Sequence, residues 1–165
     1  MPAENPEGLV NTKRTGHSVA PRYSYDIKTG KITYNSAVTG PGTGLGWLAI
    51  NTAGGSLYAS EAGCASISIY RVSNGGLTLT EKTQFKLTGT ATPGNLAFDP
   101  TGKFLYCLDN VHSTLHVLTL NQVSGQLTEP NAPTVLNEGT SEEALGLAAF
   151  SITQSLDAPG KRLDT

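Results

Sequence analysis

The sequence has little charge and no concentrated basic region. Charged residues make up 15% of the 165 residues, and the 11 lysines and arginines, outnumbered by 13 aspartates and glutamates, occur singly or in pairs. A protein that binds nucleic acid through its phosphates needs a basic patch or stripe. We therefore expect no nucleic-acid partner.

Long hydrophobic runs are also missing. No apolar stretch approaches the roughly 18 residues that a membrane-spanning helix requires. The stretch Met1–Val10 is rich in Pro, Glu and Asn, whereas a signal peptide begins with a basic stretch followed by an apolar one. These absences predict a soluble protein with no membrane partner and a cytoplasmic location.

Cysteine is scarce, with two residues in the whole sequence, Cys64 and Cys107. Two cysteines are too few for the disulfide framework of a small secreted protein, and each lies in or beside an expected strand. We expect both to be buried free thiols.

Recognisable metal and cofactor motifs are absent as well. His112 and His116 lie four residues apart, but on the extended strand expected here they would stand about 13 Å apart, too far to share a metal ion. The stretch Gly40–Gly46 does not fit the G-x-G-x-x-G dinucleotide motif and is interpreted as a loop. We expect neither a metal ion nor an organic cofactor.

The sequence is rich instead in glycine, proline and threonine, with 19, 9 and 21 residues respectively. Glycine and proline favour turns, and threonine favours strands. This mixture predicts many short strands joined by turns and argues against an all-helical bundle.

The chain also repeats itself at an offset of about 48 residues. The segment 48–51 (Leu-Ala-Ile-Asn) aligns with 96–99 (Leu-Ala-Phe-Asp), and 57–58 (Leu-Tyr) aligns with 105–106 (Leu-Tyr). Apolar residues alternate along stretches such as Thr114–Leu120, which indicates β structure. A period of this length with four short strands per unit is typical of β-propeller blades and not of helical solenoids.

We therefore expect an all-β protein, a partial β-propeller of about three blades built from four-stranded antiparallel repeats. The strands expected most clearly are Arg22–Ile27, Lys31–Val38, Trp47–Asn51, Ser56–Ser60, Ser66–Val72, Asn95–Asp99, Phe104–Asp109, Thr114–Leu120 and Gly146–Phe150. The expected organisation is an N-terminal tail (1–21), blade units near 22–38, 47–80, 95–129 and 146–150, and a C-terminal tail (151–165).

Four stretches carry a family resemblance: Thr92–Tyr106, followed by Ser113–Val117, and Leu57–Gly63, followed by Ser66–Val72. They resemble the blade signature of the lactonase-type seven-bladed β-propellers, which include 6-phosphogluconolactonases and carboxy-cis,cis-muconate cyclases. The resemblance runs from about Arg22 to Phe150 and matches the C-terminal half of a family member. It implies a small anionic sugar or muconate lactone as substrate, handled by a His and a Glu, with arginines, at the mouth of the central channel.

The positions that the family uses for this chemistry differ in this sequence. The family's Pro-Arg-His run falls on Pro93-Gly94-Asn95, its Glu after the second strand falls on Asn110, and its Asn-Arg pair falls on Glu61-Ala62. The candidate catalytic residues implied by the resemblance are thus Glu61, Asn95 and Asn110, which are otherwise ordinary polar loop residues. Candidate substrate-binding residues are Glu142 and Glu143, which are otherwise a solvated turn.

Two interpretations of function remain open. The chain is either a truncated and catalytically impaired enzyme of the lactonase or cyclase kind, or a non-catalytic propeller module for binding or assembly. A chain of about three blades leaves an apolar blade face open at each end, so it should self-associate, be capped by Met1–Pro21 and Ser151–Thr165, or be marginally stable. Of these outcomes we expect self-association through the open faces.

Overall fold

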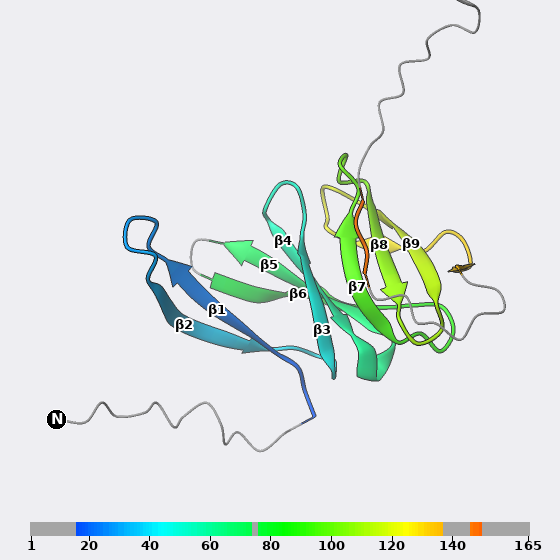
Figure 1. Ribbon diagram of the computed structural model, residues 1–165, viewed down its shortest axis with the longest axis horizontal. Helices are drawn as coiled ribbons and strands as arrows, with labels where there is room; N and C mark the ends of the chain where they lie inside the picture. The colour runs from blue at the N-terminus through cyan, green and yellow to red at the C-terminus, as the bar shows by residue number, and fades with distance from the viewer. Residues whose placement is uncertain (1–15, 74–75, 137–145, 150–165) are drawn as a thin grey trace, which may run out of the picture.

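The computed structural model describes residues 16–73, 76–136 and 146–149 and shows antiparallel β-sheets (Figure 1). The strands are β1 (Val19–Tyr25), β2 (Ile32–Thr39), β3 (Leu45–Ile50), β4 (Ser56–Glu61), β5 (Ser66–Ser73), β6 (Gly76–Lys86), β7 (Pro93–Phe98), β8 (Phe104–Asp109), β9 (Thr114–Leu120), β10 (Leu127–Thr128) and β11 (Thr134–Val135). A short 3₁₀ turn, η2 (Ala62–Cys64), follows β4. The all-β fold class is confirmed.

Strands β3 to β6 form one four-stranded antiparallel sheet, which we call the middle blade. Its strands pair in sequence order, β3-β4-β5-β6. The turn between β3 and β4 is held by Asn51, whose Oδ1 atom accepts a hydrogen bond from the Ser56 backbone N–H (3.0 Å), and by Gly54, whose φ is 71°. This sheet is the four-stranded unit that the repeat predicted.

Strands β7 to β11 form the last blade, with the order β10-β9-β8-β7. Its first turn copies that of the middle blade: Asp99 Oδ1 accepts a hydrogen bond from the Phe104 N–H (2.8 Å), and Gly102 has a φ of 69°. Its fourth strand is interrupted, because β10 and β11 both pair with β9 but are separated by a segment that contains Pro130 and Pro133. Proline has no N–H to donate to a strand ladder.

The hairpin formed by β1 and β2 has the closing turn found between β9 and β10. Asp26 Oδ1 accepts hydrogen bonds from the N–H groups two and three residues later (2.8 and 3.1 Å). Asn121 Oδ1 does the same in the last blade (both 3.0 Å). The hairpin thus has the turn that joins the third and fourth strands of the last blade, and its assignment to an earlier blade stays a prediction.

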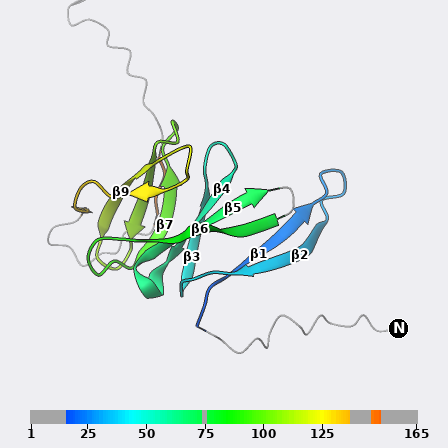
Figure 2. The same cartoon turned by 180° about the vertical axis from the view of Figure 1, so that it is seen from behind.

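The middle blade lies between the β1–β2 hairpin and the last blade (Figures 1 and 2). Tyr58 of β4 packs edge-on against Phe98 of β7, with ring centroids 5.3 Å apart, and its hydroxyl donates to the Gly125 carbonyl (2.9 Å). Burial of apolar side chains between the two blades supplies the main driving force for their association. The buried residues of this core are Tyr58, Ile67, Ile69, Leu87, Ala91, Leu96, Leu105, Cys107, Leu118, Leu120 and Leu127.

The N-terminal boundary differs from the expected one. Strand β1 begins at Val19, and Ser18 is buried, so the expectation of a tail is wrong for residues 18–21. The strand extends further back than its sequence suggests because Val19–Pro21 pairs with the end of β2. Residues 1–15 and the expected C-terminal tail (151–165) lie outside the described residues.

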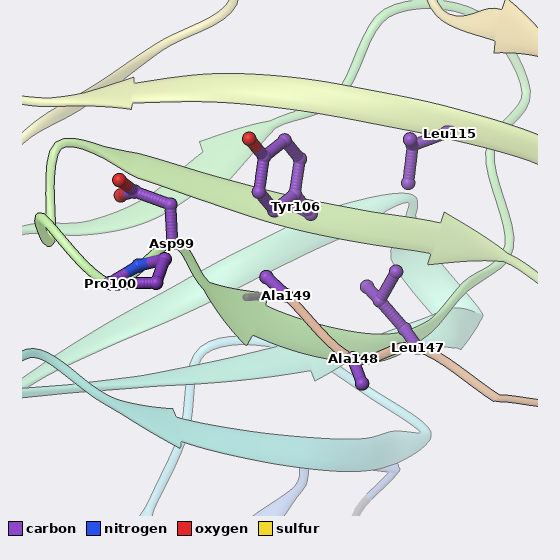
Figure 3. A pocket seen from close by; sticks show the side chains of 7 residues that line it. All are labelled: Asp99, Pro100, Tyr106, Leu115, Leu147, Ala148 and Ala149. Carbon is purple, nitrogen blue, oxygen red and sulfur yellow. The ribbon is translucent and has the colours of Figure 1, made fainter. Parts of the chain in front are cut away.

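The prediction of a strand over Gly146–Phe150 is also wrong for the four residues that the structure describes. Residues 146–149 have no strand pairing, and Phe150 lies outside the described residues. The segment lies instead against the last blade and lines a pocket of about 260 Å³ (Figure 3). The residues around this pocket are Asp99, Pro100, Tyr106, Leu115, Leu147, Ala148 and Ala149. An apolar segment without a neighbouring strand can still bury its side chains on a blade face.

Both cysteines are free, but only one is buried. Cys107 lies in the core, where burial, followed by the charges of Asp109 and Glu129, raises the pKa of its thiol. Cys64 is partly exposed because it lies in η2, at the end of the middle blade, which corrects the expectation of two buried thiols.

Candidate functional site

The ends of β4 and β8 carry carboxylates at equivalent positions of the two blades. Glu61 ends β4 and Asp109 ends β8, so they are separated by the period of about 48 residues. Each is followed by a turn with a non-glycine residue of positive φ, Ala65 (49°) or Ser113 (50°). The two carboxylates therefore occupy the same place in the same local backbone.

Glu61, the first candidate from the sequence, is completely buried (0% exposed). Its Oε1 atom accepts a hydrogen bond from the Ser68 hydroxyl (2.9 Å), and its Oε2 atom accepts one from the Ser18 hydroxyl. A Cβ atom on Gly42 would lie 2.7 Å from Glu61 Cγ, so the loop before β3 packs directly on this side chain. Glu61 thus ties the start of the described chain to the middle blade and has no exposed surface for a substrate.

Tyr70 belongs to the same buried cluster. Burial, followed by the negative charge of Glu61, raises the pKa of Tyr70 to about 12. Within the described part of the chain its buried hydroxyl has no hydrogen-bond partner. The phenol stays protonated at neutral pH, and the cluster presents no exposed acid or base.

Asn95 and Asn110, the other two candidates, contact each other. Asn110 Nδ2 donates to Asn95 Oδ1 (3.3 Å). A Cβ atom on Gly94 would lie 1.8 Å from Asn110 Oδ1, so only glycine leaves room for this amide over β7. Neither amide can act as an acid or base near neutral pH. The candidates Glu142 and Glu143 lie outside the described residues.

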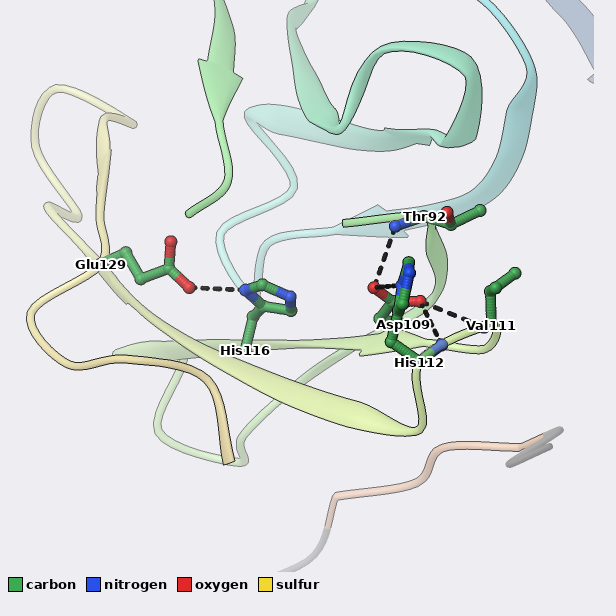
Figure 4. Close-up of polar contacts among 6 residues, drawn as sticks. All are labelled: Thr92, Asp109, Val111, His112, His116 and Glu129. Atoms are coloured by element: carbon green, nitrogen blue, oxygen red, sulfur yellow. Dashed lines mark hydrogen bonds and ion pairs between the residues drawn. The ribbon is translucent and has the colours of Figure 1, made fainter. Parts of the chain in front are cut away.

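Asp109 is buried (1% exposed) and organises the turn after β8 (Figure 4). Its Oδ1 atom accepts hydrogen bonds from the N–H groups of Val111 and His112 (both 3.0 Å), and its Oδ2 atom accepts one from the Thr92 N–H (2.9 Å). His112 Nδ1 lies 2.7 Å from the same Oδ2 atom, and the His112 side chain is 46% exposed. Burial by itself raises the pKa of Asp109, but these hydrogen bonds and the contact with His112 outweigh it and hold the pKa below its ordinary value.

A second pair, His116 and Glu129, is buried on both sides (Figure 4). His116 Nδ1 lies 2.6 Å from Glu129 Oε1, and the two side chains are 1% and 3% exposed. Glu129 Oε2 also accepts a hydrogen bond from the Thr88 N–H (2.8 Å), in the loop between β6 and β7. Glu129 lies where the fourth strand is interrupted, and it fastens this loop to β9.

A pocket of about 230 Å³ lies beside both pairs. The loop between β6 and β7 forms one wall, and the end of β8 with the start of β9 forms another. The lining residues are Thr88, Gly89, Thr90, Ala91, Asp109, His112, Thr114, His116 and Pro133. The pocket therefore combines threonine hydroxyls with an exposed imidazole that is oriented by a buried carboxylate.

The sequence placed both histidines correctly, His112 in a turn and His116 on a strand, but it missed their carboxylate partners. Asp109 precedes His112 by three residues at the start of a turn, which is the position that an Asx turn favours, so this signal was available. Glu129 lies 13 residues after His116, beyond a turn and an interrupted strand. Only the fold brings that pair together.

Within residues 16–73, 76–136 and 146–149, no group of three or more His, Cys, Asp or Glu side chains could hold a metal ion. His112 and His116 each contact a separate carboxylate. The same described part of the chain contains no helix of the length and apolarity needed to cross a membrane. The cytoplasmic location stays a prediction.

The stacked antiparallel sheets define the chain as part of a β-propeller. Residues 15–153 match the family of lactonases described as seven-bladed β-propellers, and the chain belongs to this family. No curated relative matches the chain.

Solved structures share the fold. Candidate 6-phosphogluconolactonases from Bacteroides uniformis and Bacteroides fragilis are each 25% identical over 74% of this chain, with TM-scores of 0.60 and 0.59, and are covered over 35% and 34% of their own length. A periplasmic gluconolactonase from Pseudomonas aeruginosa is 16% identical over 78% of this chain and 40% of its own, with a TM-score of 0.65. The chain thus spans between 34% and 40% of the length of these proteins.

Proposed function

We propose that the pocket beside Asp109 and His112 binds a small sugar lactone and opens its ring by hydrolysis. The proposal depends chiefly on the 2.7 Å contact between Asp109 Oδ2 and His112 Nδ1, in which the carboxylate is 1% and the imidazole 46% exposed. The lactonase family and the similarity to candidate 6-phosphogluconolactonases support this substrate class. A muconate lactone, which the resemblance also implies, is the second candidate substrate.

The pair suits general-base catalysis. A carboxylate that faces Nδ1 holds the imidazole proton there, which leaves Nε2 able to accept a proton. Nε2 would take a proton from a water molecule as that water attacks the lactone carbonyl. The ring C–O bond would then break, and the imidazolium would return the proton to the ring oxygen to give the open hydroxy acid. Because the pKa of Asp109 is lowered, the carboxylate stays ionised and can stabilise the imidazolium.

We infer that this hydrolysis is slow. Where the resemblance implies Arg and His, the chain has Gly94 and Asn95, and where it implies Glu the chain has Asn110. The guanidinium groups that would bind an anionic substrate bidentately are thus replaced at the positions that can be compared. General acid–base catalysis alone contributes on the order of 10²–10⁴-fold, and we expect a rate within this range over the spontaneous reaction.

The test is to incubate the full chain with glucono-δ-lactone, 6-phosphogluconolactone and a muconolactone, and to follow ring opening at fixed pH against buffer. We expect opening of a sugar lactone above the spontaneous rate, and a return to that rate for His112→Gln. Cys64→Ser, at the equivalent position of the middle blade, is the matched control and should keep the wild-type rate. Buffer rates for all three lactones, or equal rates for wild type and His112→Gln, would overturn the proposal.

A non-catalytic role in assembly is the second candidate function, and the β1–β2 hairpin favours it. Tyr23, Tyr25, Ile32 and Tyr34 are 53%, 63%, 66% and 44% exposed on this hairpin. Among the described strands β1 pairs with β2 alone, whereas the third strand of each other blade is paired on both edges. These exposed apolar side chains, on a strand that has one unpaired edge among the described residues, favour binding of a second copy of the chain.

This candidate is tested by light scattering over a range of concentrations. We expect concentration-dependent association of the wild type, weakened by Tyr25→Lys, which places a charge on the apolar surface. Thr33→Lys, an exposed polar position on the same hairpin, controls for charge alone. A monomer at every concentration would argue against assembly.

A further inference from the structure

The pocket beside Asp109 and His112 has no net positive charge among its titratable side chains. The titratable side chains of the two pairs are Asp109 with His112 and Glu129 with His116. Each imidazole contacts its own carboxylate, so the two pairs together carry no net positive charge even when both imidazoles are protonated. A phosphate that entered the pocket would meet carboxylates already engaged by imidazoles and gain no net attraction.

Lys86 is the basic residue that lies nearest to the pocket loop along the described chain, but its ammonium group bonds outside the pocket. Lys86 ends β6, two residues before the pocket loop, but its Nζ atom donates to the Cys64 carbonyl (2.5 Å) in the middle blade. No lysine or arginine is among the described residues that line the pocket. The lining therefore offers a phosphate ester no ammonium or guanidinium group.

The lining is uncharged apart from the two acid–imidazole pairs, and it is largely apolar with a few threonine hydroxyls. Thr88, Thr90 and Thr114 line the pocket together with the exposed His112 imidazole. A threonine hydroxyl both donates and accepts hydrogen bonds, as the hydroxyls of a sugar do. A ring that carries several hydroxyls could therefore form hydrogen bonds with these threonines while its C–H groups contact the apolar part of the lining.

We propose that the pocket selects an uncharged, polyhydroxylated lactone over the phosphate ester of the same lactone. This inference rests on the proposed function, because it takes this pocket as the lactone site. It revises the anionic substrate that the sequence resemblance implies. It also makes the electrostatics of the last blade, and not the shape of the pocket, the source of the selectivity.

The test separates binding from turnover by using lactams, which keep the ring but resist hydrolysis. Dissociation constants of the full chain are measured by calorimetry for gluconolactam and 6-phosphogluconolactam. We expect the uncharged lactam to bind about 10-fold more tightly, the scale of a weakly screened charge effect. Equal or tighter binding of the phosphorylated lactam, or no binding of either, would overturn the inference. Binding of the uncharged lactam without opening of the corresponding lactone would support the inference and overturn the hydrolysis proposed above.

A gain-of-charge variant sharpens the test. Thr90→Lys places an ammonium group on an exposed lining position and should shift the preference toward the phosphorylated lactam by about 10-fold. Thr33→Lys, on β2 and outside the lining, carries the same added charge and should leave the preference unchanged. An equal shift in both variants would show that the net charge of the protein, and not the pocket, sets the preference.

Discussion

The middle and last blades use the same structural position differently. Glu61 and Asp109 end equivalent strands, and both are buried. Glu61 accepts hydrogen bonds from two serine hydroxyls and is sealed under a glycine loop. Asp109 accepts three backbone hydrogen bonds and also contacts an exposed imidazole. A buried carboxylate at this position is thus common to both blades, and the residues that contact it decide whether it can also orient an exposed catalytic group.

Two positions of the repeat hold different residues in the two blades. Cys64 in the middle blade stands where the last blade has His112, and Ser68 stands where it has His116. A buried carboxylate must be satisfied by hydrogen bonds or by a counter-charge in either blade. Ser68 satisfies Glu61 with its hydroxyl. In the last blade His112 contacts Asp109, whereas His116 contacts a different carboxylate, Glu129.

The largest difference between the blades is expected at the His116–Glu129 pair. Glu129→Ala leaves the His116 imidazole and the Thr88 N–H buried without a partner, which should lower the free energy of unfolding by roughly 3–5 kcal/mol. Ser68→Ala, at the equivalent of His116, should cost only about 1 kcal/mol. Urea unfolding monitored by circular dichroism measures both. Equal losses would show that the His116–Glu129 pair contributes no more to stability than the hydrogen bond from Ser68 to Glu61.

The next largest effect is expected at Glu61. Glu61→Ala removes a buried side chain and leaves the Ser18 and Ser68 hydroxyls without their acceptor, so the free energy of unfolding should fall by roughly 2–4 kcal/mol. Thermal unfolding measures this loss. Glu61→Gln keeps the side-chain volume but removes the carboxylate, so it tests whether Glu61 has a catalytic role. A folded Glu61→Gln variant that no longer opens a lactone would contradict the structural role assigned to Glu61.

A smaller effect should distinguish two equivalent glycines. The Cβ atom of Gly94→Ala would lie 1.8 Å from Asn110 Oδ1, whereas that of Gly46→Ala would lie 3.2 Å from Ser60 Oγ. We expect a loss of roughly 1–3 kcal/mol at Gly94 and under about 1 kcal/mol at Gly46. Asn110→Ala should restore part of the loss at Gly94, which a double-mutant cycle would measure. Additive losses would show that the two residues do not clash.

The smallest predicted effect depends on pH. The pKa of Asp109 is lowered below its ordinary 3.8, so its ionised form is favoured by folding. The stability that wild type has over Asp109→Asn, about 1–2 kcal/mol, should be complete above the ordinary pKa and lost as the pH falls through the lowered one. Unfolding free energies of both proteins from pH 7 to pH 2 test this. A difference that grows on acidification would contradict the assignment.

Much of the fold could be predicted from short-range patterns. The offset between residues 48–51 and 96–99 predicted two blades, and the turns at Asn51 and Asp99 follow from side chains that bond to nearby backbone. The strand expected over Gly146–Phe150 failed, because its apolar run fits both a strand and a segment that packs on a blade face. Such a run cannot reveal whether a partner strand lies beside it.

The candidate site was predicted less well. Asn95 and Asn110 do meet, but the resemblance that selected them could not show that Gly94 lets Asn110 lie over β7. Glu61 was selected from the resemblance, with an ordinary polar loop residue as the alternative, and it is instead completely buried at the end of β4. Burial depends on what packs above a residue, and the residues above Glu61 come from the loop before β3, which no local pattern specifies.

The sequence alone determined the all-β class, the period of the blades and the positions of most strands, because these depend on side-chain alternation and on turns that bond within a few residues. The tertiary structure alone decided that Glu129 pairs with His116. Asp109 and His112 meet within one turn, but Glu129 reaches His116 and Thr88 only after the fourth strand of the last blade is interrupted. Contacts between residues far apart in the chain form when packing brings their strands and loops together, so the pocket and its charges belong to the folded blades.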